Sequence, residues 1–391
     1  MTADDVSPFR IEIPEEELTE LRARLEAARW PAEIDQTRPA DGITVDAMRR
    51  LVERWLHGFD WRARERELNR FPQVVTEIDG QRIHAVHRPS PRADAVPLIL
   101  LHGWPSTFVE FSRVVDDLAD PADPAQPAFH VVAPSLPGYG FSGPIRERGW
   151  GAHRMARAFA ELMRRLGYDG YLAHGGDNGY HIAAALGRVD PDHARGLHLN
   201  LGGVGLTGAH RDEPPADAAE ELAHRRYAEF VRDKSAYAQL NATRPQTLAY
   251  ALTDSPIGQL AWIAEKFTAW VDPSSPIDDD DVLTTASIYW FTRTAASSAR
   301  FYGEEFTANR PAGQGPALER TYVQTPTAVA SFPYEIVPPV RRWAQEHYNI
   351  VRWVEVPAGG HFSALERPEL VIELLRGFAA QLDREEPITR A

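Results

Sequence analysis

One stretch of the chain constrains its fold more than any other: the five residues from Gly175 to Gly179, with the sequence Gly-Gly-Asp-Asn-Gly. They follow the apolar run Tyr171–His174 and precede the helix-forming segment Tyr180–Leu186. A strand that enters a small-x-Asp-x-small turn and leaves as a helix is typical of a nucleophile elbow, a strained bend that presents its central side chain. Glycines are needed on both sides because neighbouring Cβ atoms would collide. The stretch therefore predicts Asp177 as a carboxylate nucleophile, although it also suits a loop or hairpin turn.

Apolar runs and helical patterns alternate around this stretch. Buried strands are predicted at Val96–Leu101, Phe129–Ala133, His198–Leu201, Thr325–Ser331 and Ile350–Val356. A helix with apolar residues from Met155 to Leu166 ends at Gly167, and a last helix follows Pro368. The alternation predicts an α/β fold with a mostly parallel central sheet and helices on both faces.

Two helical regions flank this core. Residues 1–72 are predicted to form an N-terminal helical arm, with helices after Pro14, after Thr44 and over Trp61–Leu68, and the first sheet strands are expected only after it. Residues 73–205 and 320–391 are assigned to the core, and residues 206–319 to an all-helical cap over the carboxyl ends of the strands. The acidic run Asp278–Asp281 is expected to be a solvent-facing helix start, since it lacks the ligand spacing of a calcium loop.

The pattern resembles the α/β-hydrolase fold, in which the nucleophile, the acid and the histidine follow one another at strand ends. Glu335 comes just after the predicted strand Thr325–Ser331, and His361 follows Ile350–Val356 behind two glycines. Both placements agree with Asp177 as nucleophile. Outside this context Glu335 would be interpreted as a surface carboxylate and His361 as a loop histidine.

The segment His102–Pro105 lies where this fold places part of the oxyanion hole. The backbone N–H groups of Trp104 and Asn178 are the predicted donors, with the Trp104 ring as a core aromatic or pocket wall. The side chain of His102 is interpreted as structural and not as a base.

An aspartate nucleophile restricts the substrate. A serine that attacked a saturated carbon would form an ether, which water cannot release, whereas an aspartate forms an ester that a histidine-activated water can hydrolyse. The sequence therefore favours an alkylating substrate, either an epoxide or a haloalkane. An epoxide needs phenols to hold the opening oxygen, and Tyr237 and Tyr302 are candidates; a halide needs indole N–H groups, for which Trp262, Trp270 and Trp290 are candidates. Each of these aromatic residues also suits simple packing.

Almost the whole chain resembles the microsomal-type epoxide hydrolases. The resemblance rests on the order and spacing of several motifs, including Phe59-Asp60-Trp61, His102–Pro105, Pro137–Ser142, Gly175-Gly176-Asp177, Glu265-Lys266-Phe267, Arg300-Phe301-Tyr302 and Gly359–Phe362. It implies Asp177 as nucleophile, His361 as base, Glu335 as its acid partner, and Tyr302 with Tyr237 as the epoxide-opening phenols. The motif around Tyr237 matches only in part. The implied reaction is the conversion of an epoxide to a vicinal diol through an aspartyl ester, without a cofactor or metal.

Two departures and two alternatives accompany this resemblance. We expect no counterpart of the membrane-anchoring helix of mammalian relatives, and Asn178 stands where relatives often have tryptophan, which leaves the pocket shape open. The resemblance permits a role in secondary metabolism. A haloalkane dehalogenase with the same triad and a non-catalytic ligand-binding homologue stay open as alternative functions.

Composition sets the remaining limits. A net charge of −14 without a basic stripe argues against nucleic acid as a partner, and the absence of cysteine excludes disulfides, thiolate metal sites and a thiol nucleophile. No apolar stretch approaches the ~20 residues of a membrane span. We therefore expect a soluble, cytoplasmic, cofactor-free enzyme with a small-molecule epoxide and water as its partners, and a homodimer is left open.

Overall fold

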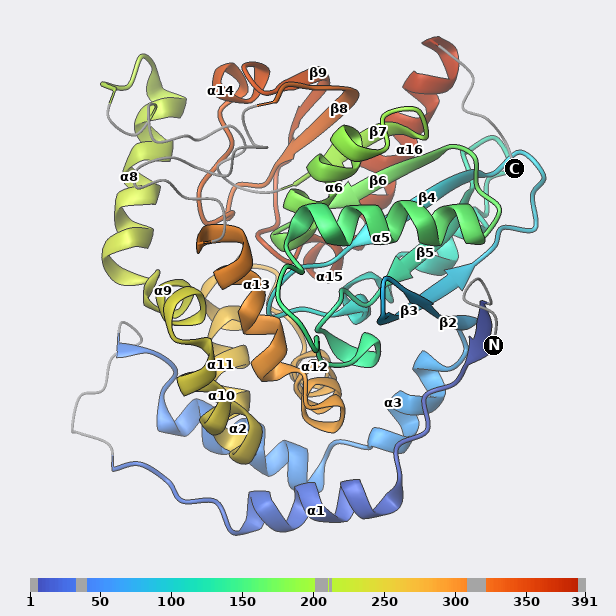
Figure 1. Cartoon of the computed structure of the whole chain (residues 1–391). Coiled ribbons are helices and arrows are strands. Elements are labelled where there is room, and N and C mark those ends of the chain that lie inside the picture. The colour runs from blue at the N-terminus through green and yellow to red at the C-terminus, as the bar shows by residue number, and fades with distance from the viewer. Residues whose placement is uncertain (1–5, 33–40, 201–209, 211–212, 308–320, 386–391) are drawn as a thin grey trace.

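A nine-stranded sheet runs through the part of the chain that the computed structural model describes, which comprises residues 6–32, 41–200, 210, 213–307 and 321–385 (Figure 1). The strands lie in the order β1-β2-β3-β5-β4-β6-β7-β8-β9. Their bounds are β1 (Ser7–Phe9), β2 (Gln73–Ile78), β3 (Gln81–Arg88), β4 (Val96–Leu101), β5 (Phe129–Pro134), β6 (Tyr171–Gly175), β7 (Ala194–Leu199), β8 (Val323–Ser331) and β9 (Tyr348–Glu355).

The sheet is parallel from β5 to β9 and antiparallel over its first three strands. This arrangement confirms the predicted α/β architecture. The expectation that no sheet strand precedes residue 73 is wrong, because β1 pairs with β2 and brings Phe9 opposite Gln73. A strand of three residues that includes a proline is too short to show a period of two, so the sequence pattern does not reveal it.

The two faces of the sheet carry separate apolar cores. Leu98 and Leu100 of β4 belong to one core and Ile99 and Leu101 to the other, as the alternation of side chains along a strand requires. The helices α5 (Ala152–Arg165) and α6 (Asn178–Val189) cover one face, and α4 (Val115–Ala119) and α16 (Pro368–Glu385) cover the other. The central strands β4 and β6 are therefore buried on both sides, which explains their continuous apolar runs.

The described residues between β7 and β8 include the following helices, which are called the cap here: α8 (Ala218–Asp233), α9 (Ala236–Thr243), α10 (Pro245–Asp254), α11 (Pro256–Ala269), α12 (Asp279–Thr292) and α13 (Ala295–Thr307). They stand beside the sheet in Figure 1. The predicted borders at 205/206 and 319/320 lie outside the described residues. Short helical segments complete the core: η2 (Phe108–Phe111), η3 (Gly140–Ser142), α14 (Arg341–Gln345) and α15 (Ser363–Glu366).

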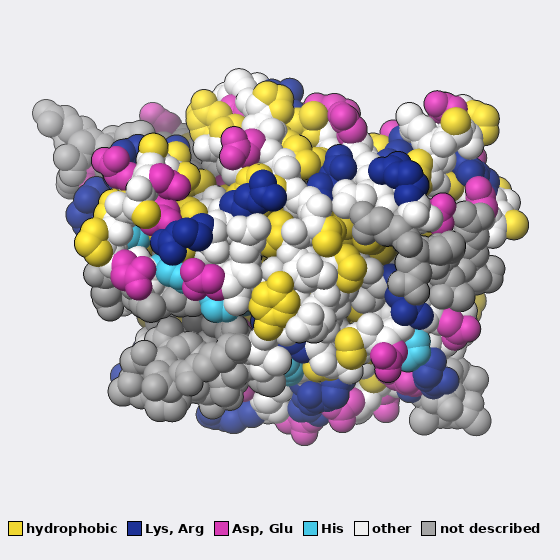
Figure 2. Space-filling view, turned by 90° about the horizontal axis from the view of Figure 1, so that it is seen from above, with side chains coloured by type: hydrophobic (Ala, Val, Ile, Leu, Met, Phe, Trp, Pro, Cys, Tyr) yellow, Lys and Arg dark blue, Asp and Glu magenta, His cyan; other side chains and the backbone are white. Residues whose placement is uncertain are grey.

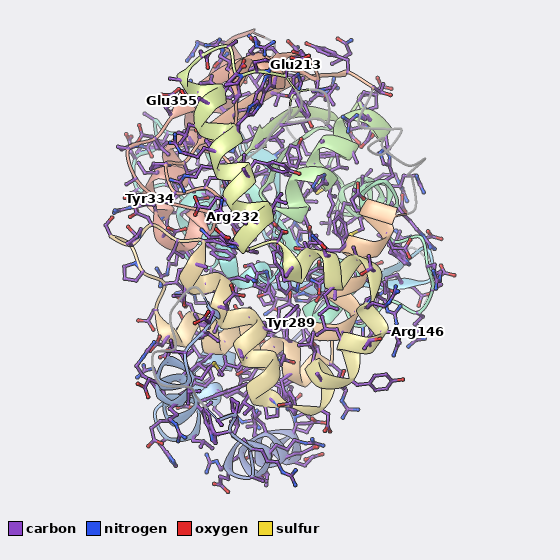
Figure 3. All side chains as sticks on the ribbon, turned by 90° about the vertical axis from the view of Figure 1, so that its left-hand side faces the viewer. Arg146, Glu213, Arg232, Tyr289, Tyr334 and Glu355 are labelled. Atoms are coloured by element: carbon purple, nitrogen blue, oxygen red, sulfur yellow. The ribbon has the colours of Figure 1, made fainter. Side chains whose placement is uncertain are left out.

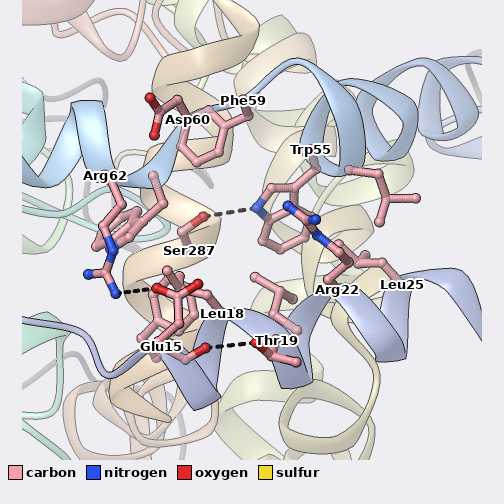
Figure 4. Close-up of a pocket in the computed structure, with 14 residues that line it drawn as sticks. Glu15, Leu18, Thr19, Arg22, Leu25, Trp55, Phe59, Asp60, Arg62 and Ser287 are labelled. Carbon is pink, nitrogen blue, oxygen red and sulfur yellow. Dashed lines mark hydrogen bonds and ion pairs between the residues drawn. The ribbon is translucent and has the colours of Figure 1, made fainter.

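The N-terminal arm consists of α1 (Glu15–Glu26), α2 (Val45–His57) and α3 (Trp61–Leu68), and it packs on the cap. Thr44 caps α2 as expected, since its side chain accepts a hydrogen bond from the Ala47 N–H. The Trp55 indole donates to Ser287 Oγ of α12 across the junction. A cavity of about 420 Å³ lies between arm and cap (Figure 4), but none of the three predicted triad residues lines it.

The acidic run Asp278–Asp281 begins α12, as expected, but its interpretation as a solvent face is wrong. Asp281 is buried and pairs with Arg113 at 2.5 Å. The two preceding aspartates pair with Arg50 and Arg54 of the arm. The run therefore connects the cap to α2 and to the core.

The surface in Figure 2 carries acidic and basic side chains that are interspersed. In the described ranges, every helix is too short or too polar to cross a lipid bilayer.

Candidate active site

Asp177 occupies a sharp bend between β6 and α6. Its backbone has φ 48° and ψ −125°, a region that residues with a side chain rarely adopt. A Cβ at Gly175 would lie 2.2 Å from the Gly179 oxygen, and a Cβ at Gly179 would lie 2.0 Å from the Leu101 oxygen. Only glycine fits at these two positions, so the packing explains the small-x-Asp-x-small pattern.

Three side chains converge at the carboxyl ends of β6, β8 and β9. His361 Nδ1 lies 2.7 Å from Glu335 Oε1, and His361 Nε2 lies 3.5 Å from Asp177 Oδ2. Glu335 Oε1 also accepts the Ile336 N–H at 2.8 Å, which holds the carboxylate in place. The side chains of His361 and Glu335 are each 2% exposed, whereas that of Asp177 is 17% exposed. Asp177 is thus the member of the three that a substrate can reach most easily.

Charge within this group changes two pKa values. Burial alone would lower the pKa of His361, but the carboxylates of Glu335 and Asp177 outweigh burial and raise it well above its usual value. Burial would raise the pKa of Asp177, but His361 and two backbone N–H groups lower it. The resting site therefore favours an ionised Asp177, which is the form that can attack carbon.

The two backbone donors predicted from the sequence face the same carboxylate. The Trp104 N–H donates to Asp177 Oδ1 at 2.7 Å, and the Asn178 N–H also hydrogen-bonds to Asp177. A Cβ at Gly103 would lie 2.3 Å from the Asp177 Cβ, so the loop can approach this closely only with glycine at that position. Two donors at one carboxylate can stabilise negative charge that develops on its oxygen.

Tyr237 of α9 and Tyr302 of α13 meet above this carboxylate. Their ring centroids lie 5.8 Å apart and their hydroxyls interact by a hydrogen bond. Tyr237 stacks on the Trp104 ring at 5.2 Å, and Tyr302 meets the same ring edge-on at 5.9 Å. Burial, the neighbouring phenol and the charge of Asp177 raise the pKa of Tyr302 well above its usual value. Burial and Asp177 likewise raise the pKa of Tyr237, so both phenols keep their protons.

The three cap tryptophans differ in position. Trp270 lies beside the triad, 5.0 Å from the His361 ring and 5.3 Å from the Tyr237 ring between centroids. Its indole N–H and that of Trp262 have no hydrogen-bond partner among the described residues. Trp290 instead packs under Arg24 of the arm.

Lys266 adds a charge that the sequence analysis did not assign. Its buried ammonium lies 4.2 Å from the centroid of the Tyr237 ring and pairs with Glu265. A cation over an aromatic face is favourable, so Lys266 stabilises the Tyr237 ring in this position.

A cap segment holds the loop that carries His361. The His361 N–H donates to the Trp270 oxygen at 2.9 Å, and the Gly359 N–H donates to Asp272 Oδ2 at 2.9 Å. Glu366 accepts the Asp272 N–H at 2.7 Å and the Phe362 N–H at 2.9 Å, and burial raises its pKa to about 7. Neither Asp272 nor Glu366 stands in a pattern that sequence reasoning singles out.

His102 has the structural role expected for it. Its Nδ1 lies 3.0 Å from the Gly103 oxygen and its Nε2 accepts the Leu136 N–H at 3.2 Å. Burial lowers the pKa of His102 to about 4, so the imidazole is neutral and both of its nitrogens are engaged.

Tyr334, which precedes Glu335, is 43% exposed and lies at the edge of the molecule in Figure 3, while Tyr289 lies among the cap helices. Within the described residues, no group of three or more histidine, aspartate or glutamate side chains is arranged to hold a metal ion.

Comparisons with known proteins cover nearly the whole chain. Residues 6–111 match the family described as epoxide hydrolase N terminus, and residues 96–243 match the alpha/beta hydrolase fold. Epoxide hydrolase 1 of Sus scrofa is 31% identical, with 98% of this chain and 90% of the pig protein covered.

Solved structures of epoxide hydrolases are also similar to this chain over nearly its whole length. Aspergillus niger epoxide hydrolase has a TM-score of 0.85 and 36% identity, with 97% of each chain covered. Juvenile hormone epoxide hydrolase from the silkworm Bombyx mori has a TM-score of 0.90 and 28% identity, with 98% of this chain and 96% of the silkworm chain covered.

Proposed function

The chain belongs to the epoxide hydrolase family of the α/β-hydrolase fold, and on that premise we propose that it converts an epoxide to a vicinal diol through an ester on Asp177. The observation that carries the proposed mechanism is the convergence on one ionised carboxylate of a histidine, two backbone donors and two protonated phenols.

In the first step, Asp177 Oδ2 attacks a ring carbon of the epoxide. A carbon–oxygen bond forms to the carboxylate while the ring carbon–oxygen bond breaks, and the electron pair moves to the ring oxygen. The hydroxyls of Tyr237 and Tyr302 hold that oxygen, and one of them donates its proton. Oδ1 stays on the Trp104 N–H and becomes the carbonyl oxygen of the ester.

In the second step, His361 Nε2 removes a proton from water, and the resulting hydroxide attacks the ester carbonyl carbon. The N–H groups of Trp104 and Asn178 stabilise the oxyanion. Glu335 stabilises the imidazolium through its bond to Nδ1. Collapse of the tetrahedral intermediate passes the proton of the His361 imidazolium to the departing alcohol oxygen and releases the diol. The carboxylic acid left on Asp177 returns its proton to the phenolate, so carboxylate, imidazole and phenol end as they began. The sum is epoxide plus water to diol.

Formation of the ester should lower the pKa of His361. The negative charge of Asp177 is one of two that raise this pKa in the resting site, and esterification removes it. We expect the His361 imidazole of Asp177→Asn, titrated by nitrogen-15 NMR, to have a lower pKa than in the wild type. The hydrolysis step, which needs neutral His361, should accordingly accelerate as pH rises through that lower pKa. An unchanged or higher pKa in the variant would show that Asp177 does not control the base.

Loss of either phenol should slow ring opening. Tyr302→Phe and Tyr237→Phe each remove one donor to the ring oxygen, and we expect about a 10²-fold slower single-turnover alkylation for each. Hydrolysis of the ester should stay unchanged because the phenols do not take part in it. Tyr250→Phe, in which a 72% exposed cap tyrosine is changed, is the matched control. Wild-type alkylation rates in both active-site variants would contradict the assignment.

The indole N–H of Trp270 lies beside His361 and has no hydrogen-bond partner in the part of the chain that the structure describes, which supports haloalkane dehalogenation as a second candidate function. Chloride release from a 1-chloroalkane that persists in Tyr302→Phe and disappears in Trp270→Phe would favour it.

The direct test of the proposed function is a panel of terminal and aryl epoxides, beginning with styrene oxide, with chiral analysis of the products. We expect vicinal diols from at least one class and incorporation of one oxygen from labelled water. Absence of diol across the panel would overturn the proposal.

A further inference from the structure

The loop between β5 and α5 forms three hydrogen bonds with residues 294–298 at the start of α13. The Gly140 N–H donates to Thr294 Oγ1 at 3.1 Å, and Ser297 Oγ donates to the Gly138 oxygen. The Tyr139 hydroxyl donates to the Ser298 oxygen at 3.2 Å. A loop of the core therefore determines where this cap helix starts.

The same tyrosine also reaches the nucleophile elbow. Asn178 Nδ2 donates to the Tyr139 hydroxyl at 2.9 Å, and Asn178 is the residue whose backbone N–H faces the Asp177 carboxylate. One hydroxyl thus accepts from the elbow and donates to α13. Tyr139 and Ser298 are fully buried and Asn178 is 4% exposed, so water does not compete for these bonds.

Tyr302 follows Ser298 by one helical turn. Residues four apart lie on the same side of a helix, so a shift of α13 at Ser298 moves Tyr302 by a similar amount. Tyr302 also packs edge-on against Trp104, which lies in the loop that hydrogen-bonds to Asp177.

We propose that Tyr139 is a positioning residue that ties α13 to the nucleophile elbow and thereby sets the distance between the Tyr302 hydroxyl and the carbon that Asp177 attacks. This inference rests on the proposed function and extends it. Tyr139 acts through Tyr302 and touches neither substrate nor the reacting atoms.

The competing explanation is that Tyr139 only fills the core, since its ring lies 5.4 Å from the His102 ring and 6.3 Å from the Tyr289 ring. Tyr139→Phe keeps the ring and removes the two hydrogen bonds. If the substitution only disturbed the packing of the core, it would slow the alkylation step and the hydrolysis step alike. A displaced Tyr302 would slow alkylation alone, because the donors and the base used in hydrolysis come from the core.

The experiment is single-turnover stopped flow with styrene oxide, using the fluorescence of the tryptophans beside the site. For Tyr139→Phe we expect alkylation to slow by about 10- to 100-fold, as a misplacement on the order of 1 Å produces, while ester hydrolysis keeps its wild-type rate. Asn178→Leu removes the hydrogen bond from the Asn178 side chain to the Tyr139 hydroxyl and leaves the Asn178 backbone N–H in place. This variant should also slow alkylation. Tyr171→Phe is the matched control, because it removes the hydrogen bond of a buried tyrosine to Asp190 at the amino end of β6, the end away from the elbow.

Hydrogen exchange makes the test independent of the reaction. In Tyr139→Phe, the amides of α13 should exchange faster than in the wild type and in Tyr171→Phe. Unchanged alkylation, or an equal loss in both kinetic steps, would overturn the inference, as would α13 exchange identical to the wild type. A wild-type protein that forms no diol would instead refute the proposed function, and the exchange measurement would still decide whether Tyr139 holds α13.

Discussion

Replacement of Asp177 by asparagine is expected to reduce epoxide turnover by about 10⁴-fold or more, the loss typical of removing one member of a catalytic triad. The amide is a poor nucleophile towards a saturated carbon, so the ester cannot form. The shape of the side chain and its acceptor for the Trp104 N–H are kept, so the elbow should retain its structure. Steady-state diol formation from styrene oxide measures the effect.

Slow hydrolysis of the asparagine amide at this site could restore the carboxylate. Intact-mass analysis before and after the assay separates that event from residual activity of the variant. Asp254→Asn is the matched control, because the Asp254 side chain is 83% exposed on the cap and should leave turnover unchanged. Full activity in Asp177→Asn that still carries its amide would remove Asp177 from the mechanism.

Replacement of His361 by glutamine is expected to separate the two chemical steps. Asp177 and the two phenols remain, so the epoxide still opens, but no base activates the water that must hydrolyse the ester. We expect one equivalent of epoxide to be consumed in a burst, with a steady-state rate lower by about 10²- to 10⁴-fold, the usual contribution of a general base.

The covalent adduct is the decisive observation in that variant. Its intact mass should increase by the mass of one epoxide, and peptide mapping should place the ester on Asp177. His57→Gln, at a histidine whose side chain is 62% exposed on the arm, should show neither burst nor adduct. A His361→Gln protein that turns over slowly without any adduct would argue for direct attack of water on the epoxide.

Short-range sterics made much of the fold and of the candidate site predictable. A Cβ would overlap the backbone or the Asp177 side chain at Gly175, Gly179 and Gly103. Only glycine fits at these positions, so the close approaches are visible in the sequence. The order of Asp177, Glu335 and His361 could be predicted because each follows a mainly apolar run that forms a strand of the sheet, β6, β8 and β9 respectively. The epoxide hydrolase resemblance found in those motifs is confirmed by relatives that match over nearly the whole chain.

The contacts that span the core and the cap could not be predicted in this way. Helical periodicity does not tell which of three cap tryptophans lies beside His361, and only packing selected Trp270. Asp281 appeared to be a surface residue because its partner, Arg113, is distant in the chain. Strand β1 was missed because three residues carry no measurable period.

The sequence by itself predicted the order of Asp177, Glu335 and His361 along the chain and the bend at Asp177, and it favoured a carboxylate nucleophile. Each of these predictions depends on neighbouring residues or on the ends of long apolar runs. Tertiary structure alone decided that Tyr237 and Tyr302 meet over Trp104, that Asp272 and Glu366 hold the His361 loop, and that Tyr139 joins the elbow to α13. The physical reason is that these bonds join elements that are far apart in the chain, and their geometry is set by how helices and sheet pack and not by any local pattern.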